Sequence, residues 1–152
     1  MDSKTLRESV MKYLSYRPRS LAEVTRYLRT KTSDAALINQ TLDFLKKYKL
    51  VDDAAFARWL IESRSRSRPR GSRLLKQELK QKGIDLTSVS LPDVDEKTLA
   101  FQALNKKQPL WSGLSGKDYR LKATRYLTTR GFSWEVIAET VKKGYNDLHV
   151  NR

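Results

Sequence analysis

The sequence predicts an all-α protein, arranged as an elongated array of three tandem three-helix repeats. Apolar residues recur at the three- and four-residue spacing of amphipathic helices, and no stretch shows the alternation of a half-buried strand. Most glycines and prolines fall singly at the ends of these apolar stripes, where they terminate helices. Similar helical patterns return after 51 and then 48 residues, which indicates repetition.

The first repeat is expected over residues 1–50. Its first helix ends before Pro18. A capping box formed by Ser20 and Glu23 begins the second helix, because the hydroxyl and the carboxylate can each accept a free amide of the first turn. A third helix follows Ser33–Asp34. The apolar stripes of the three helices are Leu6, Val10, Tyr13 and Leu14; Leu21, Val24, Tyr27 and Leu28; and Leu37, Ile38, Leu42, Leu45 and Tyr48.

The second repeat is expected over residues 51–92, with two full helices and a short third one. A Pro-Arg-Gly turn separates the full helices, and the second ends at a glycine suited to the left-handed conformation that closes many helices. A proline cuts the third helix short. The marking residues are Asp52 or Asp53 at the first start, Pro69–Gly71 at the turn, Gly83 at the second end, and Asp85 and Pro92 around the short helix, which carries Leu86 and Val89.

The third repeat is expected over residues 93–146, followed by a C-terminal tail at 147–152. Its first helix is separated from the next by a loop-rich linker, residues 108–116, and glycines are expected to end the last two helices. The marking residues are Asp93 or Asp95 at the first start, Gly131 at the end of the second helix, and Ser133 and Gly144 at the start and end of the last.

The repeats can be aligned on Leu28, Leu79 and Leu127. This alignment brings Tyr27, Glu78 and Tyr126 into register, with Arg19, Arg70 and Asp118 nine residues before the aligned leucines. Chance similarity among amphipathic helices is the alternative explanation. A row of repeats presents an extended concave face, which suits a polymer or a filament groove better than a small ligand.

Composition excludes several classes of protein. The 152 residues include no cysteine, which excludes a disulfide scaffold, thiolate catalysis and Cys-ligated zinc. The single histidine, His149, excludes His-cluster metal sites and is expected in a polar tail after the last helix. The longest apolar runs, Ala35–Ile38 and Ala54–Ala57, are too short for a membrane span or a signal peptide. The protein is therefore expected in the cytoplasm, with no membrane partner.

The sequence offers no recognisable catalytic apparatus. No glycine-rich phosphate loop is present. The acidic clusters Asp52–Asp53 and Asp93–Glu96 stand immediately before helices, where capping and the helix dipole explain them, with paired acid–base catalysis as the alternative. We expect a protein that is not an enzyme and needs no cofactor or metal.

The charge is strongly and unevenly positive. Lys and Arg number 31 against 17 Asp and Glu, for a net charge of +14. Residues 58–82 carry nine cations against two acids and so hold half of the excess. They favour Arg, the better fork for phosphates and carboxylates. A solvated helix face is the plain alternative to a binding surface. The predicted basic patch is Arg58, Arg64, Arg66, Arg68, Arg70, Arg73, Lys76, Lys80 and Lys82, continued by Arg120, Lys122, Arg125 and Arg130.

The three tryptophans could stack on nucleic-acid bases, as aromatic side chains do in single-strand binders. Trp134 begins a helix whose other apolar residues face inward, so a core position is expected for it. Trp59 lies on a basic helix and fits either role, and Trp111 is expected to anchor packing between repeats. Tyr13, Tyr27, Tyr48 and Tyr126 are expected in the core, with their hydroxyls at its rim.

Three stretches resemble the RecX-type regulatory proteins, modulators of the RecA recombinase. Val51–Arg64 is similar to the family's central motif, and Arg70–Ile84 to the string that follows it. Arg125–Ser133 is similar to the signature of the third repeat, whereas the match in the first repeat is looser. The resemblance covers about residues 5–144. One departure is Ser72, which follows Gly71 where many members have proline.

The resemblance implies an all-helical, non-enzymatic regulator. Such a protein binds in the groove of the RecA–single-stranded DNA filament and inhibits its extension, ATP hydrolysis, strand exchange and co-protease activity. The implied partners are the RecA filament and single-stranded DNA, with double-stranded DNA left open, and a monomer is expected. We interpret the basic patch as the surface that meets the filament. Reversing Arg64, Arg66, Arg68 and Arg70 to Glu is expected to abolish inhibition while leaving helicity intact.

Other functions remain open from the sequence. The first alternative is a direct DNA-binding protein without sequence specificity and without a recombinase partner. A steep salt dependence on naked DNA, equal with and without recombinase, would favour it. A helical adaptor for another acidic protein is a second alternative. A helix-turn-helix repressor is disfavoured because the sequence shows no dimerisation seam.

Overall fold

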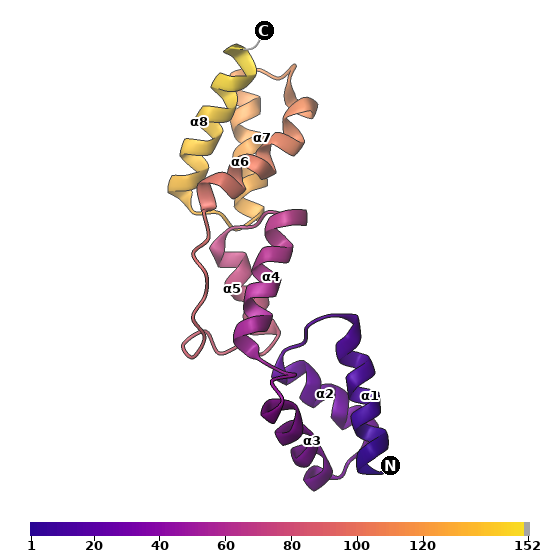
Figure 1. Ribbon diagram of the computed structural model, residues 1–152. Coiled ribbons are helices and arrows are strands. Elements are labelled where there is room, and N and C mark those ends of the chain that lie inside the picture. Colours follow the sequence, from indigo (N-terminus) through magenta and orange to yellow (C-terminus); the bar gives the residue numbers. More distant parts are fainter. Residues whose placement is uncertain (151–152) are drawn as a thin grey trace. The chain divides into compact units, whose positions relative to one another are not determined.

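The structure is a computed structural model that describes residues 1–150, and over these residues it is all-helical (Figure 1). Eight α-helices and one 3₁₀ helix are present and the described part holds no strand, which confirms the predicted all-α class. The elements are α1 (Ser3–Tyr16), α2 (Leu21–Lys31), α3 (Ala35–Lys47), α4 (Asp53–Ser67), α5 (Ser72–Gln81), α6 (Glu96–Lys107), η1 (Gln108–Trp111), α7 (Gly116–Thr129) and α8 (Trp134–Val150).

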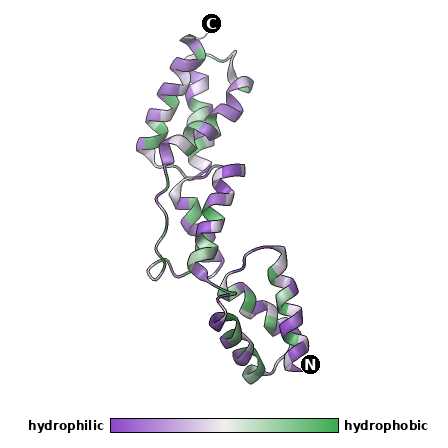
Figure 2. Cartoon of the chain, in the orientation of Figure 1, coloured by the Kyte–Doolittle hydropathy of each residue, from purple (hydrophilic) through white to green (hydrophobic). Residues whose placement is uncertain are grey.

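The helices form two compact units. Unit 1 combines Met1–Leu60 with Leu79–Leu91, and unit 2 combines Ile61–Glu78 with the chain from Pro92 onward. The helices show mixed apolar and polar positions, as expected of helices that bury one stripe (Figure 2). The aligned leucines Leu28, Leu79 and Leu127 are all completely buried, so the repeat alignment selects true core positions.

Unit 1 has a core built by α1, α2 and α3. The caps of α2 and α3 are those that the sequence predicts, whereas the Asp2 cap of α1 was not predicted. Asp2 accepts from the Thr5 N–H, and Ser20 with Glu23 forms a complete capping box. Asp52 caps α4 by accepting from the amides of the first turn, whereas the neighbouring Asp53 accepts the Leu21 N–H at 2.8 Å. The core residues are Leu6, Val10, Val24, Leu28, Ile38, Leu45 and Val51.

Glu23 links several elements of unit 1. Its carboxylate accepts from the Arg17 guanidinium and from the Ser20 N–H, and the Lys82 ammonium lies 3.9 Å away. Burial alone would raise the pKa of the Glu23 carboxyl, but the hydrogen bonds and nearby cations outweigh burial and lower it. Gly83 packs here with φ +80°, and a Cβ would lie only 2.3 Å from the Ala22 Cβ. The glycine predicted to end α5 is therefore also required for close packing.

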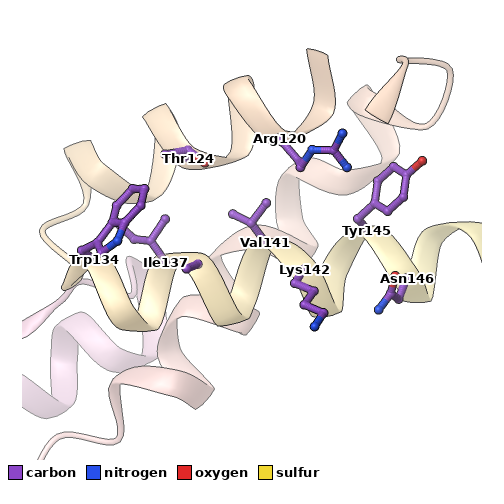
Figure 3. Close-up of a pocket in the computed structure, with 9 residues that line it drawn as sticks. Arg120, Thr124, Trp134, Ile137, Val141, Lys142, Tyr145 and Asn146 are labelled. Atoms are coloured by element: carbon purple, nitrogen blue, oxygen red, sulfur yellow. The ribbon is translucent and has the colours of Figure 1, made fainter. Parts of the chain in front are cut away.

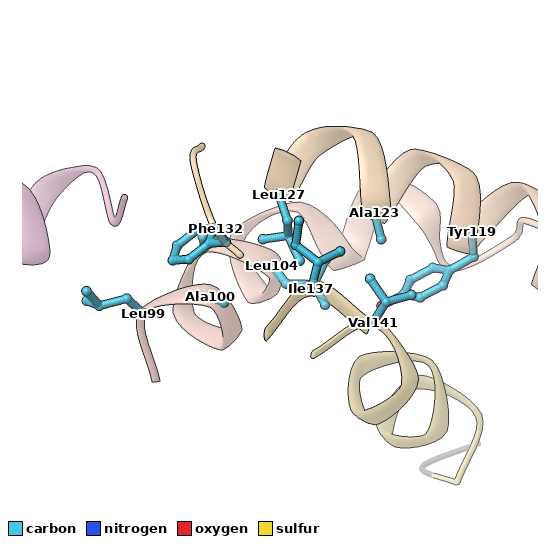
Figure 4. Close-up of a cluster of buried hydrophobic side chains, with 10 residues drawn as sticks. Leu99, Ala100, Leu104, Tyr119, Ala123, Leu127, Phe132, Ile137 and Val141 are labelled. Carbon is cyan, nitrogen blue, oxygen red and sulfur yellow. The ribbon is translucent and has the colours of Figure 1, made fainter. Parts of the chain in front are cut away.

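Unit 2 has its core between α6, α7 and α8 (Figure 4). Tyr119 is completely buried, and its hydroxyl accepts from the Gln108 side-chain amide at 3.1 Å. The same amide donates to the Gly144 carbonyl at 3.0 Å. Burial raises the pKa of the Tyr119 phenol. The core residues are Leu99, Ala100, Ala103, Leu104, Tyr119, Ala123, Leu127, Phe132, Ile137 and Val141.

The expected end of the last helix at Gly144 is wrong. Helix α8 continues through Gly144 to Val150, so His149 is helical and its ring lies 4.1 Å from that of Tyr145. A Cβ at Gly144 would lie 2.5 Å from a methyl of Leu104. This glycine serves a close helix–helix approach and does not terminate the helix.

The short helix expected from Asp85 is also wrong. The Asp85 carboxylate accepts from both the N–H and the hydroxyl of Thr87, at 3.0 and 2.7 Å. Such a local side-chain bond competes with helical hydrogen bonds, and the segment forms a turn. In the expected linker at 108–116, residues 108–111 form the 3₁₀ helix η1.

Two aromatic residues expected in the core are exposed. Tyr48 stands at the C-cap of α3, one position past the last helical residue, and is 58% exposed. Trp134 is the first residue of α8 and is 72% exposed. Both stand at helix ends, where helical spacing no longer predicts which side a residue faces. Tyr13 and Tyr27 do pack as expected and stack at 4.2 Å.

The turn between α4 and α5 packs against the end of α7 through two glycines of unit 2. The Gly71 N–H donates to the Arg130 carbonyl at 2.9 Å. A Cβ at Gly71 would lie 2.2 Å from the Gly131 carbonyl oxygen. Since the Gly131 oxygen belongs to the backbone and the Cβ position is fixed by the backbone of residue 71, no side-chain rotation can relieve the overlap.

We expect Gly71→Ala to lower the free energy of unfolding of unit 2 by about 2–3 kcal/mol, because overpacking here forces backbone apart. Urea denaturation followed by circular dichroism measures this change. Gly113→Ala is the matched control, since a Cβ there meets no atom within 4 Å. Equal stability of the two variants would contradict the close approach.

Candidate nucleic-acid and partner interface

The predicted basic patch divides into two groups by environment. Four of its thirteen cations are half-buried and in contact with other side chains: Arg64, Arg70, Lys82 and Arg130. The other nine are exposed: Arg58, Arg66, Arg68, Arg73, Lys76, Lys80, Arg120, Lys122 and Arg125. Arg58, Lys80 and Lys82 belong to unit 1, and the rest belong to unit 2.

Glu78 forms ion pairs with two arginines of the predicted basic patch, Arg64 and Arg70. Arg64 of α4 donates to both carboxylate oxygens of Glu78 in a fork, with Nε–O distances of 3.0 and 3.1 Å. Arg70, in the turn after α4, donates to the same carboxylate at 3.1 Å. The hydrogen bond that Arg64 donates to Glu78 raises the pKa of the Arg64 guanidinium. Arg64 and Arg70 therefore help to hold α4, the following turn and α5 together through Glu78.

The two other half-buried cations also have contacts within their units. The Lys82 ammonium lies 3.9 Å from Glu23, and the Arg130 guanidinium lies over the Tyr126 ring at 5.3 Å. Three of these four cations pair with an acid on another part of the chain, so helical spacing alone does not separate them from the exposed ones. Glu78, the single acid of α5, was the available signal.

The exposed cations of the predicted patch in unit 2 lie near the turn between α4 and α5 and on α7. Arg66 lies in the last turn of α4 and Arg68 directly after the helix, and no ion pair links either to a described residue. Arg73 and Lys76 are three residues apart on α5, so they share a helix face. The exposed cations of the predicted patch in unit 2 are Arg66, Arg68, Arg73, Lys76, Arg120, Lys122 and Arg125.

Arg73 links the cations of α5 to those of α7. Its guanidinium donates to the Thr128 carbonyl at 3.3 Å, one helical turn beyond Arg125. Arg125 and Lys122 are in turn three residues apart on α7, which places them on one face. Arginine side chains presented in this way can form paired hydrogen bonds with phosphate or carboxylate oxygens.

Two of the three tryptophans pack against other aromatic rings. Trp111 packs edge-on against Tyr119 and Tyr126 at 6.1 and 6.0 Å, so it anchors packing inside unit 2. Trp59 is half-buried, with its ring centroid 5.7 Å from that of Phe56.

Over the described residues, no group of His, Cys, Asp or Glu could hold a metal ion. None of the described helices has the length and hydropathy to cross a bilayer.

Comparison with known families assigns all three parts of the chain to one family. Residues 7–45, 52–87 and 95–141 match the first, second and third three-helix domains of RecX, in that order. The chain belongs to the RecX family. The three tandem three-helix domains predicted from the sequence are thereby confirmed.

Similar RecX relatives extend over most of the chain. The chain is 37% identical to regulatory protein RecX of Chlorobium phaeobacteroides, over 92% of this chain and 93% of the relative. It is 33% identical to regulatory protein RecX of Chlorobium limicola, over 88% and 85%. The regulatory protein RecX of Bacillus pumilus is longer: the match, at 32% identity, covers 91% of this chain and 55% of that protein. These names support a regulatory role for the chain.

A solved structure supports the fold. The crystal structure of RecX from Lactobacillus salivarius is 22% identical and superposes with a TM-score of 0.80, over 93% of this chain and 95% of that one. At this identity the likeness concerns the fold alone.

Ser72, the position that departs from the family resemblance, forms a hydrogen bond in the structure. The Ser72 N–H donates to the Glu96 carboxylate at 2.7 Å, a bond that a proline at this position could not make. Ser72 is the first residue of α5, so this bond ties the start of α5 to the start of α6 within unit 2.

We expect Glu78→Gln to lower the free energy of unfolding of unit 2 by about 2 kcal/mol, less than for a fully buried pair, because two half-buried guanidinium groups lose their counter-charge. Thermal and urea denaturation measure the loss. Glu139→Gln is the control: its ion pair with Lys97 is largely exposed, so a change within about 0.5 kcal/mol is expected. An equal, small effect of both substitutions would mean that the Glu78 ion pairs contribute little to stability, and that Arg64 and Arg70 are available to a binding partner.

Proposed function

We propose that the chain is a non-enzymatic regulator that binds the RecA–single-stranded DNA filament and inhibits its extension, ATP hydrolysis, strand exchange and co-protease activity. It acts as a monomer in the cytoplasm. Membership of the RecX family and relatives named regulatory protein RecX support this proposal. Its contacts are with RecA and with DNA.

One observation carries the proposal beyond family membership. Seven cations of the predicted basic patch are exposed on unit 2, and none of these seven has an ion pair with a described residue. Both DNA phosphates and an acidic protein surface are suitable partners for them. Arg64 and Arg70 form ion pairs with Glu78 and so hold the turn between α4 and α5. Arg66, Arg68 and Arg73 are close to this turn in sequence.

Inhibition follows from differential affinity. A regulator can shift a filament between conformations only by binding one of them more tightly than the others. A molecule whose cations engage both protein and DNA would favour the filament state in which both sites are correctly spaced. It would thereby slow the steps of the ATPase cycle that leave that state.

We expect ATP hydrolysis by RecA on single-stranded DNA to fall at physiological salt when this protein is present below one molecule per RecA protomer. Binding one filament state would affect several protomers, which explains why such ratios suffice. A coupled ATPase assay measures the effect, with naked-DNA affinity determined in parallel.

The parallel measurement separates the proposal from the alternative of direct DNA binding. If the protein leaves hydrolysis unchanged while binding naked DNA tightly, it is a DNA-binding protein without a recombinase partner. On naked duplex the logarithm of affinity would then fall with the logarithm of salt concentration by about 0.9 per phosphate contact.

We expect the triple variant Arg66→Glu, Arg68→Glu and Arg73→Glu to lose inhibition of the RecA ATPase while keeping its helical content. This variant replaces the reversal set that includes Arg64 and Arg70, since those changes would put three carboxylates together at Glu78. Circular dichroism and the ATPase titration measure the two properties.

The matched control reverses exposed lysines of unit 1, Lys12→Glu with Lys46→Glu. It changes net charge by four, against six for the triple variant, and should retain most of the inhibition. Equal loss in both variants would mean that total charge, and not this surface, supports binding.

A further inference from the structure

A groove of about 410 Å³ lies between α7 and α8 in unit 2 (Figure 3). Trp134 begins α8 at one end, and its indole extends toward α7, while Arg120 extends from α7 toward Tyr145 near the other end. Between them lie the side chains of Ile137 and Val141. The lining residues are Arg120, Thr124, Trp134, Ile137, Ala138, Val141, Lys142, Tyr145 and Asn146.

Trp134 has no packing role that accounts for it. It is 72% exposed, whereas Trp111 and Trp59 are half-buried against other rings. A large aromatic side chain left exposed at the edge of a groove is informative, because it would bury considerable apolar area on contact with a ligand. Its flat face can stack on another flat group.

The charge of the groove is wholly positive. Arg120 and Lys142 line it, and no carboxylate does. The acid of the middle part of α8, Glu139, pairs with Lys97 of α6 at 3.3 Å and lines a different hollow. The Arg120 guanidinium lies 5.4 Å from the centre of the Tyr145 ring, which fixes a cation beside the second aromatic.

We propose that this groove binds single-stranded DNA, with one unpaired base stacked on the Trp134 indole and the adjoining phosphates held by Arg120 and Lys142. Aromatic faces combined with cations are how single strands are bound without sequence preference. A duplex keeps its base faces covered by stacking, so the groove selects unpaired strands. The inference extends the proposed function by naming a site for the strand, and its test needs only naked DNA.

The test is the affinity for a fluorescently labelled oligothymidylate, measured by anisotropy. Trp134→Ala should weaken binding about tenfold, within the range found when a stacked aromatic is truncated, and Trp134→Phe should retain most of it. Quenching of tryptophan fluorescence by the oligonucleotide should be reduced in Trp134→Phe. Affinity for a duplex of the same length should change little in both variants.

Salt dependence separates the stacking residue from the phosphate-binding ones. Trp134→Ala should leave the slope of log affinity against log salt unchanged, because stacking releases no counterions. Arg120→Gln and Lys142→Gln should each reduce the slope by about 0.7. Leu110→Ala is the control for truncation of an exposed apolar residue, since Leu110 is also 72% exposed in unit 2, and its affinity should match the wild type.

Three outcomes would overturn the inference. The first is unchanged oligothymidylate affinity in Trp134→Ala with helicity intact. The second is an equal loss for duplex and single strand. The third is unchanged DNA affinity together with lost RecA inhibition, which would assign the groove to a protein partner. Failure of the proposed function itself is distinguishable, because it is read from the RecA ATPase of the wild-type protein.

Discussion

The Glu78 carboxylate, shared by Arg64 and Arg70, is the interaction on which the middle of the chain depends. It joins α4, the following turn and α5 within unit 2. The turn is thereby held where Gly71 can meet Gly131 and donate to the Arg130 carbonyl. A strongly basic helix pair would repel itself without this carboxylate, so one acid lets the surrounding arginines remain close together in a folded structure.

The same design recurs in unit 1. Glu23 is buried at the start of α2 and accepts from Arg17, with Lys82 nearby. The position before the aligned leucine has a related use in two repeats: Tyr27 bonds to Ser9 of α1, and Glu78 bonds to Arg64 of α4. A polar tip at this position therefore ties the second helix of a repeat to its first, although the residue type differs.

The ion pairs distinguish cations that stabilise the fold from cations that are exposed and open to a partner. A net charge of +14 shows only that an anionic partner is plausible. The ion pairs engage Arg64 and Arg70 within the fold, whereas seven other cations of the predicted patch are exposed on unit 2. The groove beside Trp134 adds an aromatic component, so that one unit offers both phosphate-binding side chains and a surface for stacking.

The sequence by itself determined the helical class, most helix starts and the buried stripes, because capping and apolar spacing are local properties. Ser20, Asp34 and Asp95 cap helices as their positions indicate. It could not determine which arginines are free, since the partners of Arg64 and Arg70 lie 14 and 8 residues away on another helix. Only tertiary packing decided that Gly144 lies inside a helix and that Trp134 faces solvent. Whether a glycine ends a helix or allows another helix to pack closely depends on what lies against it in the tertiary structure. The first residue of a helix has no preceding helical turn, so helical spacing does not predict whether its side chain is buried.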